Sequence, residues 1–143
     1  MTKQMKQTEL PITDEQLIAE ARKAREFAYA PYSRFPVGAA LFAKSGKVYT
    51  GCNIENSSYG LSICAERVAL FKAVSNGERE FLTIAVVGMD SSPVFPCGAC
   101  RQVLYEFSPD LTVLTLDNNN VIKHSLKELL PDGFSLQKDK RDE

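Results

Sequence analysis

The sequence contains no long apolar run, no cluster of basic residues and no hydrophobic signal core. No apolar stretch approaches the roughly 20 residues that a membrane-spanning helix needs. Residues 1–10 are polar, and we therefore expect a chain that stays in the reducing environment of the cytoplasm. The 17 Lys and Arg residues are spread along the chain and balanced by 18 Asp and Glu residues, for a formal charge of −1. Nucleic acids and anionic membranes attract clustered cations, so we expect neither as a partner, and a small, nearly neutral ligand fits better.

Internal repeats and linkers are also absent, which predicts a single domain over residues 1–143. We expect an ordered core at about residues 14–136, flanked by a disordered polar arm over residues 1–11 and a charged tail from Lys138. Hydrophobic residues make up 44% of the chain and charged residues 24%, which is typical of a globular protein. A domain of this length buries roughly 70% of the surface that its unfolded chain exposes.

Capping and turn residues divide the chain into short elements. A helix is predicted from Thr13 or Asp14 until Pro31 ends it. The remaining predictions, in chain order, are strands over 37–43 and 47–55, a helix over 64–75, a strand over 82–88 buried on both faces, a helix from Cys97 or Ala99 to Phe107, strands over 111–116 and 121–125, and a short helix over 126–130. The order α-β-β-α-β-α-β-β-α predicts the α/β class, with a mixed five-stranded sheet covered by helices.

Two short segments carry the chemistry: Cys64-Ala65-Glu66, and Pro96-Cys97-Gly98-Ala99-Cys100. Three thiolates at this spacing suit a zinc ion, and three protein ligands leave a fourth position open for water, as in catalytic zinc sites. The nearby carboxylate of Glu66 suits a proton shuttle. Residues 64 and 66 of a regular helix point about 200° apart. Glu66 therefore meets the metal only if Cys64 lies at or before the first turn.

Both segments are expected at helix N-termini, where the helix dipole favours negative charge and lowers thiol pKa values. Three thiolates and one Zn²⁺ sum to a charge of −1. Arg67 and Arg101 follow the cysteines directly and are placed to offset this charge around the metal.

Two other readings of the cysteines stay open. A Cys-x-x-Cys segment in a reducing compartment can be a thiol–disulfide couple, although that does not explain Cys64 and Glu66. A closed structural site could use Cys52 as a fourth thiol. Strand alternation speaks against the closed site, because Cys52 lies on the opposite face of its strand from Asn53 and Glu55.

At these residues the chain resembles the small, homotetrameric, zinc-dependent cytidine deaminase family of pyrimidine salvage. The Cys-x-Glu…Pro-Cys-x-x-Cys pattern is typical of zinc-dependent deaminases. The resemblance spans about residues 14–136 and extends to further segments in the family order, namely Phe35-Pro-Val-Gly-Ala-Ala40, Gly51-Cys-Asn-Ile-Glu-Asn56, Cys64-Ala-Glu-Arg67, Pro96-Cys-Gly-Ala-Cys-Arg-Gln102 and Leu129-Leu-Pro-Asp-Gly-Phe134. It implies the three-layer α/β/α sandwich of that family.

The resemblance also implies the activity, which is hydrolytic deamination of cytidine and deoxycytidine to uridine and deoxyuridine with release of ammonia. Zinc-activated hydroxide attacks C4 of the base, and Glu66 shuttles the proton. One Zn²⁺ per chain would be held by Cys64, Cys97 and Cys100. The implied substrate contacts are Phe35 against the pyrimidine, Asn53 and Glu55 at the ribose 3′-hydroxyl, the Ala65 N–H at the base carbonyl, and Tyr59 and Phe134 from a neighbouring subunit of a homotetramer.

Several of these positions have simpler readings. Asn53 and Glu55 could be a turn cap and a solvated charge, and Phe35 could belong to the core. We expect His124 to be a surface residue at a strand edge. The substrate could be another aminopyrimidine, such as an aminonucleoside antibiotic of the blasticidin type. A zinc-binding module without catalysis would need Cys52, and polynucleotide editing would need a cationic track that the chain lacks.

Overall fold

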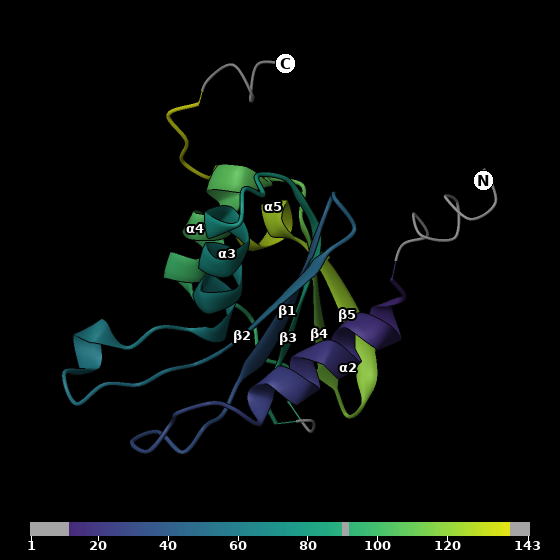
Figure 1. Cartoon of the computed structure of the whole chain (residues 1–143). Coiled ribbons are helices and arrows are strands. Elements are labelled where there is room, and N and C mark those ends of the chain that lie inside the picture. Colours follow the sequence, from purple (N-terminus) through teal and green to yellow (C-terminus); the bar gives the residue numbers. More distant parts are fainter. Residues whose placement is uncertain (1–11, 90–91, 138–143) are drawn as a thin grey trace.

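The structure, a computed structural model, describes residues 12–89 and 92–137 (Figure 1). The predicted polar arm over residues 1–11 and the predicted tail from Lys138 lie outside the described residues.

Helix α2 (Asp14–Arg25) begins where the sequence predicts, because Thr13 caps it with a complete capping box. The predicted end at Pro31 is wrong. The chain leaves the helix after Arg25 through a tighter turn, and the Tyr29 N–H then donates to the Asn53 carbonyl, 3.0 Å away. Pairing with a distant segment therefore ends this helix before any proline does.

The five predicted strands are all present: β1 (Gly38–Ala43), β2 (Val48–Cys52), β3 (Phe81–Val87), β4 (Thr112–Asp117) and β5 (Asn120–Ser125). They form one sheet in the order β2-β1-β3-β4-β5. The β3–β4 pair is parallel and the other pairs are antiparallel, which confirms the mixed sheet. The parallel pair needs a crossover connection, and helix α4 supplies it.

Helices cover both faces of the sheet (Figure 1). Helix α2 lies on one face, and α3 (Ala65–Ser75), α4 (Gly98–Phe107) and α5 (Leu126–Leu129) lie on the other. This confirms the three-layer α/β/α arrangement. A short 3₁₀ helix, η1 (Tyr59–Leu61), was not predicted. No helix among the described residues is long and apolar enough to cross a membrane.

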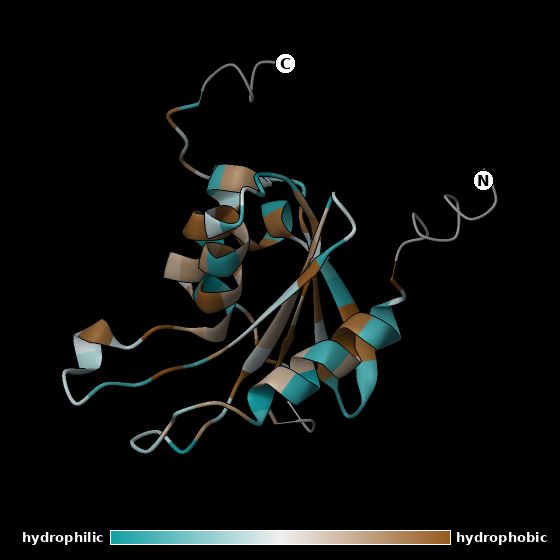
Figure 2. Ribbon diagram, in the orientation of Figure 1, coloured by the Kyte–Doolittle hydropathy of each residue, from teal (hydrophilic) through white to brown (hydrophobic). Residues whose placement is uncertain are grey.

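Each face of the sheet has its own apolar core. Leu17, Ile18 and Ala21 of α2 join one core, and most of the buried residues of α3, α4 and α5 join the other. Figure 2 shows hydrophilic residues on the outer side of α2. The prediction that β3 is buried on both faces fails at its start, because Leu82 is exposed. From Ile84 to Val87 the strand is fully covered.

Two glycines let the helices approach the sheet closely. A Cβ on Gly38 would lie 2.0 Å from the Ala21 carbonyl oxygen of α2, and one on Gly51 would lie 2.5 Å from the Ala65 carbonyl oxygen of α3. Real Cβ atoms do not approach backbone this closely, so a larger residue would push the helix away. Gly51 therefore sets the position of the α3 N-terminus, where Cys64 lies.

Candidate metal centre and active site

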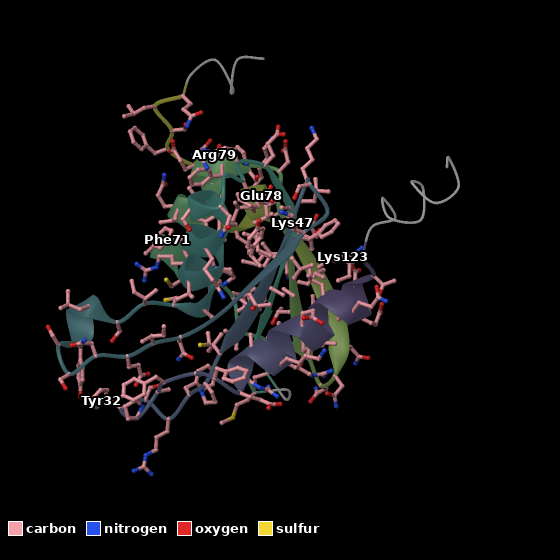
Figure 3. The ribbon with its side chains drawn as sticks, viewed as in Figure 1. Tyr32, Lys47, Phe71, Glu78, Arg79 and Lys123 are labelled. Atoms are coloured by element: carbon pink, nitrogen blue, oxygen red, sulfur yellow. The ribbon has the colours of Figure 1, made fainter. Side chains whose placement is uncertain are left out.

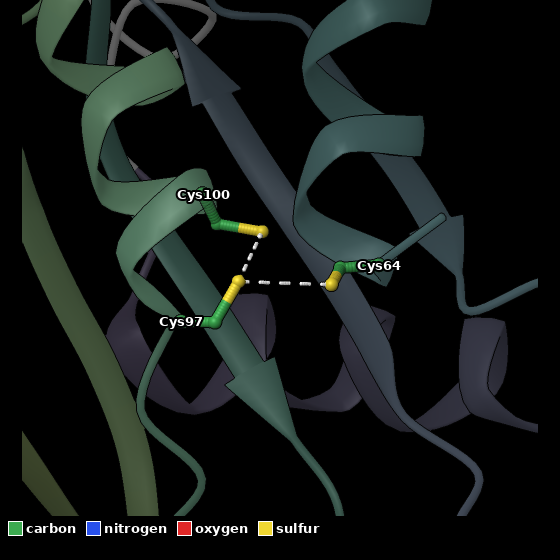
Figure 4. A group of neighbouring side chains, drawn as sticks. All are labelled: Cys64, Cys97 and Cys100. Atoms are coloured by element: carbon green, nitrogen blue, oxygen red, sulfur yellow. Dashed lines mark hydrogen bonds between the residues drawn. The ribbon is translucent and has the colours of Figure 1, made fainter. Parts of the chain in front are cut away.

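Three cysteine sulfurs from two separate segments converge at one point (Figure 4). The Sγ atoms of Cys64 and Cys97 are 3.9 Å apart, and those of Cys97 and Cys100 are 3.6 Å apart. A tetrahedral zinc ion with Zn–S bonds of about 2.3 Å separates its sulfurs by about 3.8 Å. All three Sγ atoms lie within 4.8 Å of one another, so the set fits a zinc ion without rearrangement.

The cysteines meet because they stand at helix N-termini. Cys64 is the N-cap of α3 and Cys97 is the N-cap of α4, and both have extended backbone angles. Neither side chain forms a capping hydrogen bond. Cys100 lies one turn into α4 and is fully buried. The positive ends of two helix dipoles therefore meet at the three sulfurs, which favours thiolates there.

Glu66 lies in the first turn of α3 and is only 4% exposed. Because Cys64 precedes the helix proper, the separation of about 200° expected in a regular helix does not hold here. The Glu66 carboxyl lies close enough to Cys64 and Cys100 for their charges to interact. Burial raises the pKa of Glu66 to about 7, and the charge of Cys64 also contributes. A carboxyl with a pKa near neutrality can both accept and deliver a proton.

The Cys64 and Cys100 thiols differ in their pKa values. The pKa of the Cys64 thiol falls to about 5, first because the neighbouring Cys100 thiol stabilises its thiolate and also because the Arg67 guanidinium does. The same interaction with Cys64, together with burial, raises the pKa of the Cys100 thiol. The Arg67 guanidinium lies 3.4 Å from the Cys64 sulfur through Nη2. Arg67 thus lies beside the Cys64 sulfur.

Arg101 makes different contacts from those we expected. Its Nε donates to the Pro96 carbonyl at 2.7 Å, and its Nη1 donates to the Leu129 carbonyl at 2.7 Å. The guanidinium therefore ties the segment before Cys97 to the end of α5, and no hydrogen bond to a sulfur is present among its described contacts.

Cys52 is separate from the sulfur cluster. It is the last residue of β2, pairs with Gly38 of β1, and is half-buried, which raises the pKa of its thiol. Among the described residues, the group of sulfurs able to share one metal ion contains only Cys64, Cys97 and Cys100. This arrangement supports the open three-cysteine site over the closed four-cysteine one.

Asn53 and Glu55 follow β2 and bind the segment that leads into β1. Asn53 accepts from the Val37 N–H at 2.9 Å and donates to the Phe35 carbonyl at 2.9 Å. Glu55 accepts from the backbone N–H groups of Tyr32 and Ser33 at 2.9 and 3.1 Å, and from the Ser33 hydroxyl. Sequence reasoning missed Ser33, since no local pattern relates it to a glutamate 22 residues away.

The predicted aromatic contacts lie at the surface. Phe35 is 36% exposed and its ring lies beside Gly88, where an added Cβ would be 3.0 Å from it. Tyr59 and Phe134 are 72% and 64% exposed. The ring of Tyr59 lies 5.6 Å from that of Tyr32, and the Phe134 carbonyl accepts from Gln102 of α4 at 2.9 Å. His124, expected at the surface, packs edge-on against Phe95.

Comparison with known proteins agrees with this geometry. Residues 11–116 match a family profile described as the cytidine and deoxycytidylate deaminase zinc-binding region. The chain belongs to this family. It is 54% identical to the cytidine deaminase of Sporosarcina psychrophila over 123 residues, which cover 85% of this chain and 90% of that protein. It is also 36% identical to the blasticidin-S deaminase of Bacillus cereus, over 66% of this chain and 74% of that protein.

Solved structures extend the likeness to the fold. The crystal structure of cytidine deaminase from Burkholderia pseudomallei superposes with a TM-score of 0.82 at 54% identity, covering 86% of this chain and all of that one. The enzyme from Mycobacterium tuberculosis gives a TM-score of 0.77 at 42% identity, covering 87% of this chain and 100% of that one. The chain thus belongs to a zinc-binding family, and its three converging cysteines form a cluster able to hold the metal ion.

Proposed function

We propose that this chain catalyses the zinc-dependent hydrolytic deamination of cytidine and deoxycytidine, giving uridine or deoxyuridine and ammonia. The observation that carries the proposal is the meeting of Cys64, Cys97 and Cys100 with the buried carboxyl of Glu66. A structural zinc site has no need of a buried acid, whereas hydrolysis of an amidine needs a group that moves protons. Cytosolic cysteines remain reduced, so we propose that the enzyme acts in the cytoplasm.

Zinc held by the three sulfurs would supply an activated water for attack at C4 of the base. Glu66 would take a proton from this water and deliver it to N3 of the cytosine ring. The same carboxyl would then take the second proton of that water, from the hydroxyl now on C4, and pass it to the amino group, which leaves as ammonia. Arg67, 3.4 Å from the Cys64 sulfur, would offset the negative charge of the thiolates and so keep the metal a strong Lewis acid.

The substrate contacts that we propose come from the α3 N-terminus and from the loops around it. The Ala65 N–H has no hydrogen-bond partner among the described residues, which leaves it available to the base carbonyl. Asn53 and Glu55 would bind the ribose 3′-hydroxyl, and Phe35 would pack against the pyrimidine. These polar groups already bind backbone of the 32–37 segment, so they are held in place before substrate arrives.

We further propose a homotetramer in which Tyr59 and Phe134 complete a neighbouring subunit's site. Both side chains are exposed in the single chain, and so are Leu61 of η1 and Phe71 of α3. Leu61 and Phe71 also line a hollow of about 550 Å³ together with Ile54 and Val68. An apolar surface of this kind is typical of a subunit contact. Sedimentation of the zinc-loaded protein tests this part of the proposal.

The first test is ultraviolet absorbance loss on adding cytidine, with zinc content measured on the same sample. We expect turnover with about one zinc per chain, as the three-ligand site implies. Blasticidin S is the second substrate to assay, since the chain also resembles a blasticidin-S deaminase. Zinc without turnover of either compound would contradict the proposal. In that case loss of zinc in Cys52→Ser would favour a structural site.

A further inference from the structure

The loop between α2 and β1 turns sharply at Pro31–Arg34 and has no strand partner there. The turn is closed by the Arg34 N–H, which donates to the Ala30 carbonyl at 2.9 Å. Arg34 itself adopts a left-handed backbone conformation (φ +58°), which is unfavourable for a residue other than glycine. Such a turn persists only where other contacts hold it in place.

Glu55 supplies most of those contacts. Its Oε1 accepts two backbone N–H groups of the turn, from Tyr32 at 2.9 Å and from Ser33 at 3.1 Å. Its Oε2 accepts the hydroxyl of Ser33. A carboxylate offers about four acceptor positions, and the turn occupies three of them. One acceptor position, on Oε2, remains for a ligand.

Ser33 connects the Glu55 carboxylate to the backbone of Phe35. Its hydroxyl donates to Glu55 and accepts from the Phe35 N–H at 3.1 Å. The Phe35 carbonyl accepts from Asn53 at 2.9 Å. One serine hydroxyl therefore lies at the centre of a hydrogen-bonded chain that includes Phe35, Asn53 and Glu55, the three residues for which we propose substrate contacts.

We propose that Ser33 is a specificity-determining positioning residue, which acts through Glu55 on recognition of the sugar 3′-hydroxyl. This inference rests on the proposed function. The Ser33 hydroxyl holds Oε2 in one orientation, so that its free acceptor position points in a defined direction. The same hydrogen bond is the main reason why the pKa of Glu55 is lowered, and the carboxylate therefore stays ionised and able to accept a hydroxyl.

The decisive experiment compares two substrates that differ only at the 3′ position, 2′-deoxycytidine and 2′,3′-dideoxycytidine. The readout is the ratio of their kcat/KM values in the zinc-loaded wild type and in Ser33→Ala. Without the serine hydroxyl, Glu55 is no longer oriented for the 3′-hydroxyl, and we expect this ratio to fall roughly tenfold. The change should come mainly from a higher KM for deoxycytidine, with kcat nearly unchanged. Ser33→Thr retains a hydroxyl and should restore most of the ratio.

The chain offers a matched control. The Ser45 hydroxyl donates to the Glu78 carboxylate at 2.7 Å, an equivalent exposed Ser–Glu pair at the β1–β2 turn. Figure 3 shows Glu78 at the opposite end of the molecule from Tyr32 of the proposed loop. Ser45→Ala should leave the substrate ratio at the wild-type value. Thermal unfolding of each variant checks that it is folded.

Every outcome of the Ser33→Ala experiment either supports or overturns the role proposed for Ser33. Equal loss of kcat/KM for both substrates in Ser33→Ala would show that Ser33 only shapes the loop, and would overturn the inference while leaving the deaminase intact. An unchanged ratio would overturn it as well. Failure of the proposed function has a different signature, because the zinc-loaded wild type itself would then turn over neither cytidine nor deoxycytidine.

Discussion

The helices of this protein begin in two different ways. Helices α2 and α5 start with capping boxes, in which Thr13 and Ser125 bind the helix backbone. Helices α3 and α4 start at Cys64 and Cys97, whose side chains form no capping hydrogen bond. A good cap stabilises a protein by about 1 kcal/mol relative to alanine. The two helices at the metal site therefore lack a stabilisation that the other two have.

This difference shows that the metal site lies at the helix N-termini whose N–H groups are not capped. An uncapped N-terminus presents free N–H groups and a positive dipole, which are suited to binding anions. At α3 and α4 this field acts on the cysteine sulfurs and leaves the Ala65 N–H without a protein partner among the described residues. At α2 and α5 the same groups are satisfied locally and serve only stability.

The largest effect is expected from replacing Cys97, the N-cap of α4 that lies at the metal site, with a residue that caps the helix by hydrogen bonding. Cys97→Asn removes a zinc ligand but introduces a preferred capping residue, and Cys97→Ala removes the ligand without adding a cap. Both variants should lose zinc and activity. Without metal, the free energy of unfolding of Cys97→Asn should exceed that of Cys97→Ala by about 0.5–2 kcal/mol. Urea unfolding in the presence of a chelator measures this, and equal stabilities would show that α4 cannot be capped at this position.

Glu66 provides the second test, since it is an acidic residue in the first turn of an uncapped helix. Glu66→Gln keeps the size of the side chain and removes its ability to move a proton. We expect kcat to fall by about 10²–10⁴-fold, while the zinc content stays the same. Near-normal turnover in the zinc-loaded variant would contradict the assigned role.

The control for this variant is Glu15→Gln, which changes an exposed acid in the first turn of the capped helix α2. Its interaction with the helix dipole contributes only about 0.3–1 kcal/mol to stability. Activity should be unaffected, since Glu15 lies on the opposite side of the sheet from α3.

The smallest effect is expected at the structural cap itself. Thr13→Ala removes the capping box of α2 and should lower the free energy of unfolding by about 1 kcal/mol, with a decrease in Tm of roughly 3 °C. The kcat and KM for cytidine should not change. A parallel loss of activity would mean that the capped helix α2 is coupled through the sheet to the uncapped helices at the metal site. It would contradict the conclusion that the cap of α2 serves only stability.

Much of the fold could be predicted because its signals are local. The start of α2 follows from Thr13, and the β4–β5 turn follows from Asn118 and Asn119, both of which adopt positive φ angles in the structure. Predictions failed where contacts between segments far apart in the sequence override the local signals. The Tyr29–Asn53 pairing ends α2 early, and the exposed Leu82 depends on which part of β3 the helices leave uncovered.

The candidate site also has features that local sequence signals predicted and features that they did not. Its ligand types, spacing and carboxylate were predicted from two short segments, because cysteine and glutamate carry their chemistry wherever they stand. The contacts of Arg101 with the Pro96 and Leu129 carbonyls, and of Ser33 with Glu55, were not predicted. The Arg101–Leu129 and Ser33–Glu55 contacts join residues 28 and 22 positions apart, and no periodicity or capping rule relates any of these pairs.

By itself, therefore, the sequence determined the elements, the order of the helices and strands, and the residues able to bind zinc and move a proton. These depend on local propensities, capping and side-chain chemistry. Only the tertiary structure decided that Cys64 and Cys97, 33 residues apart, lie with their sulfurs 3.9 Å from each other while Cys52 stays outside. That distance is set by how closely α3 and α4 pack on the sheet, with α3 positioned at Gly51, and close packing is a property of the whole fold.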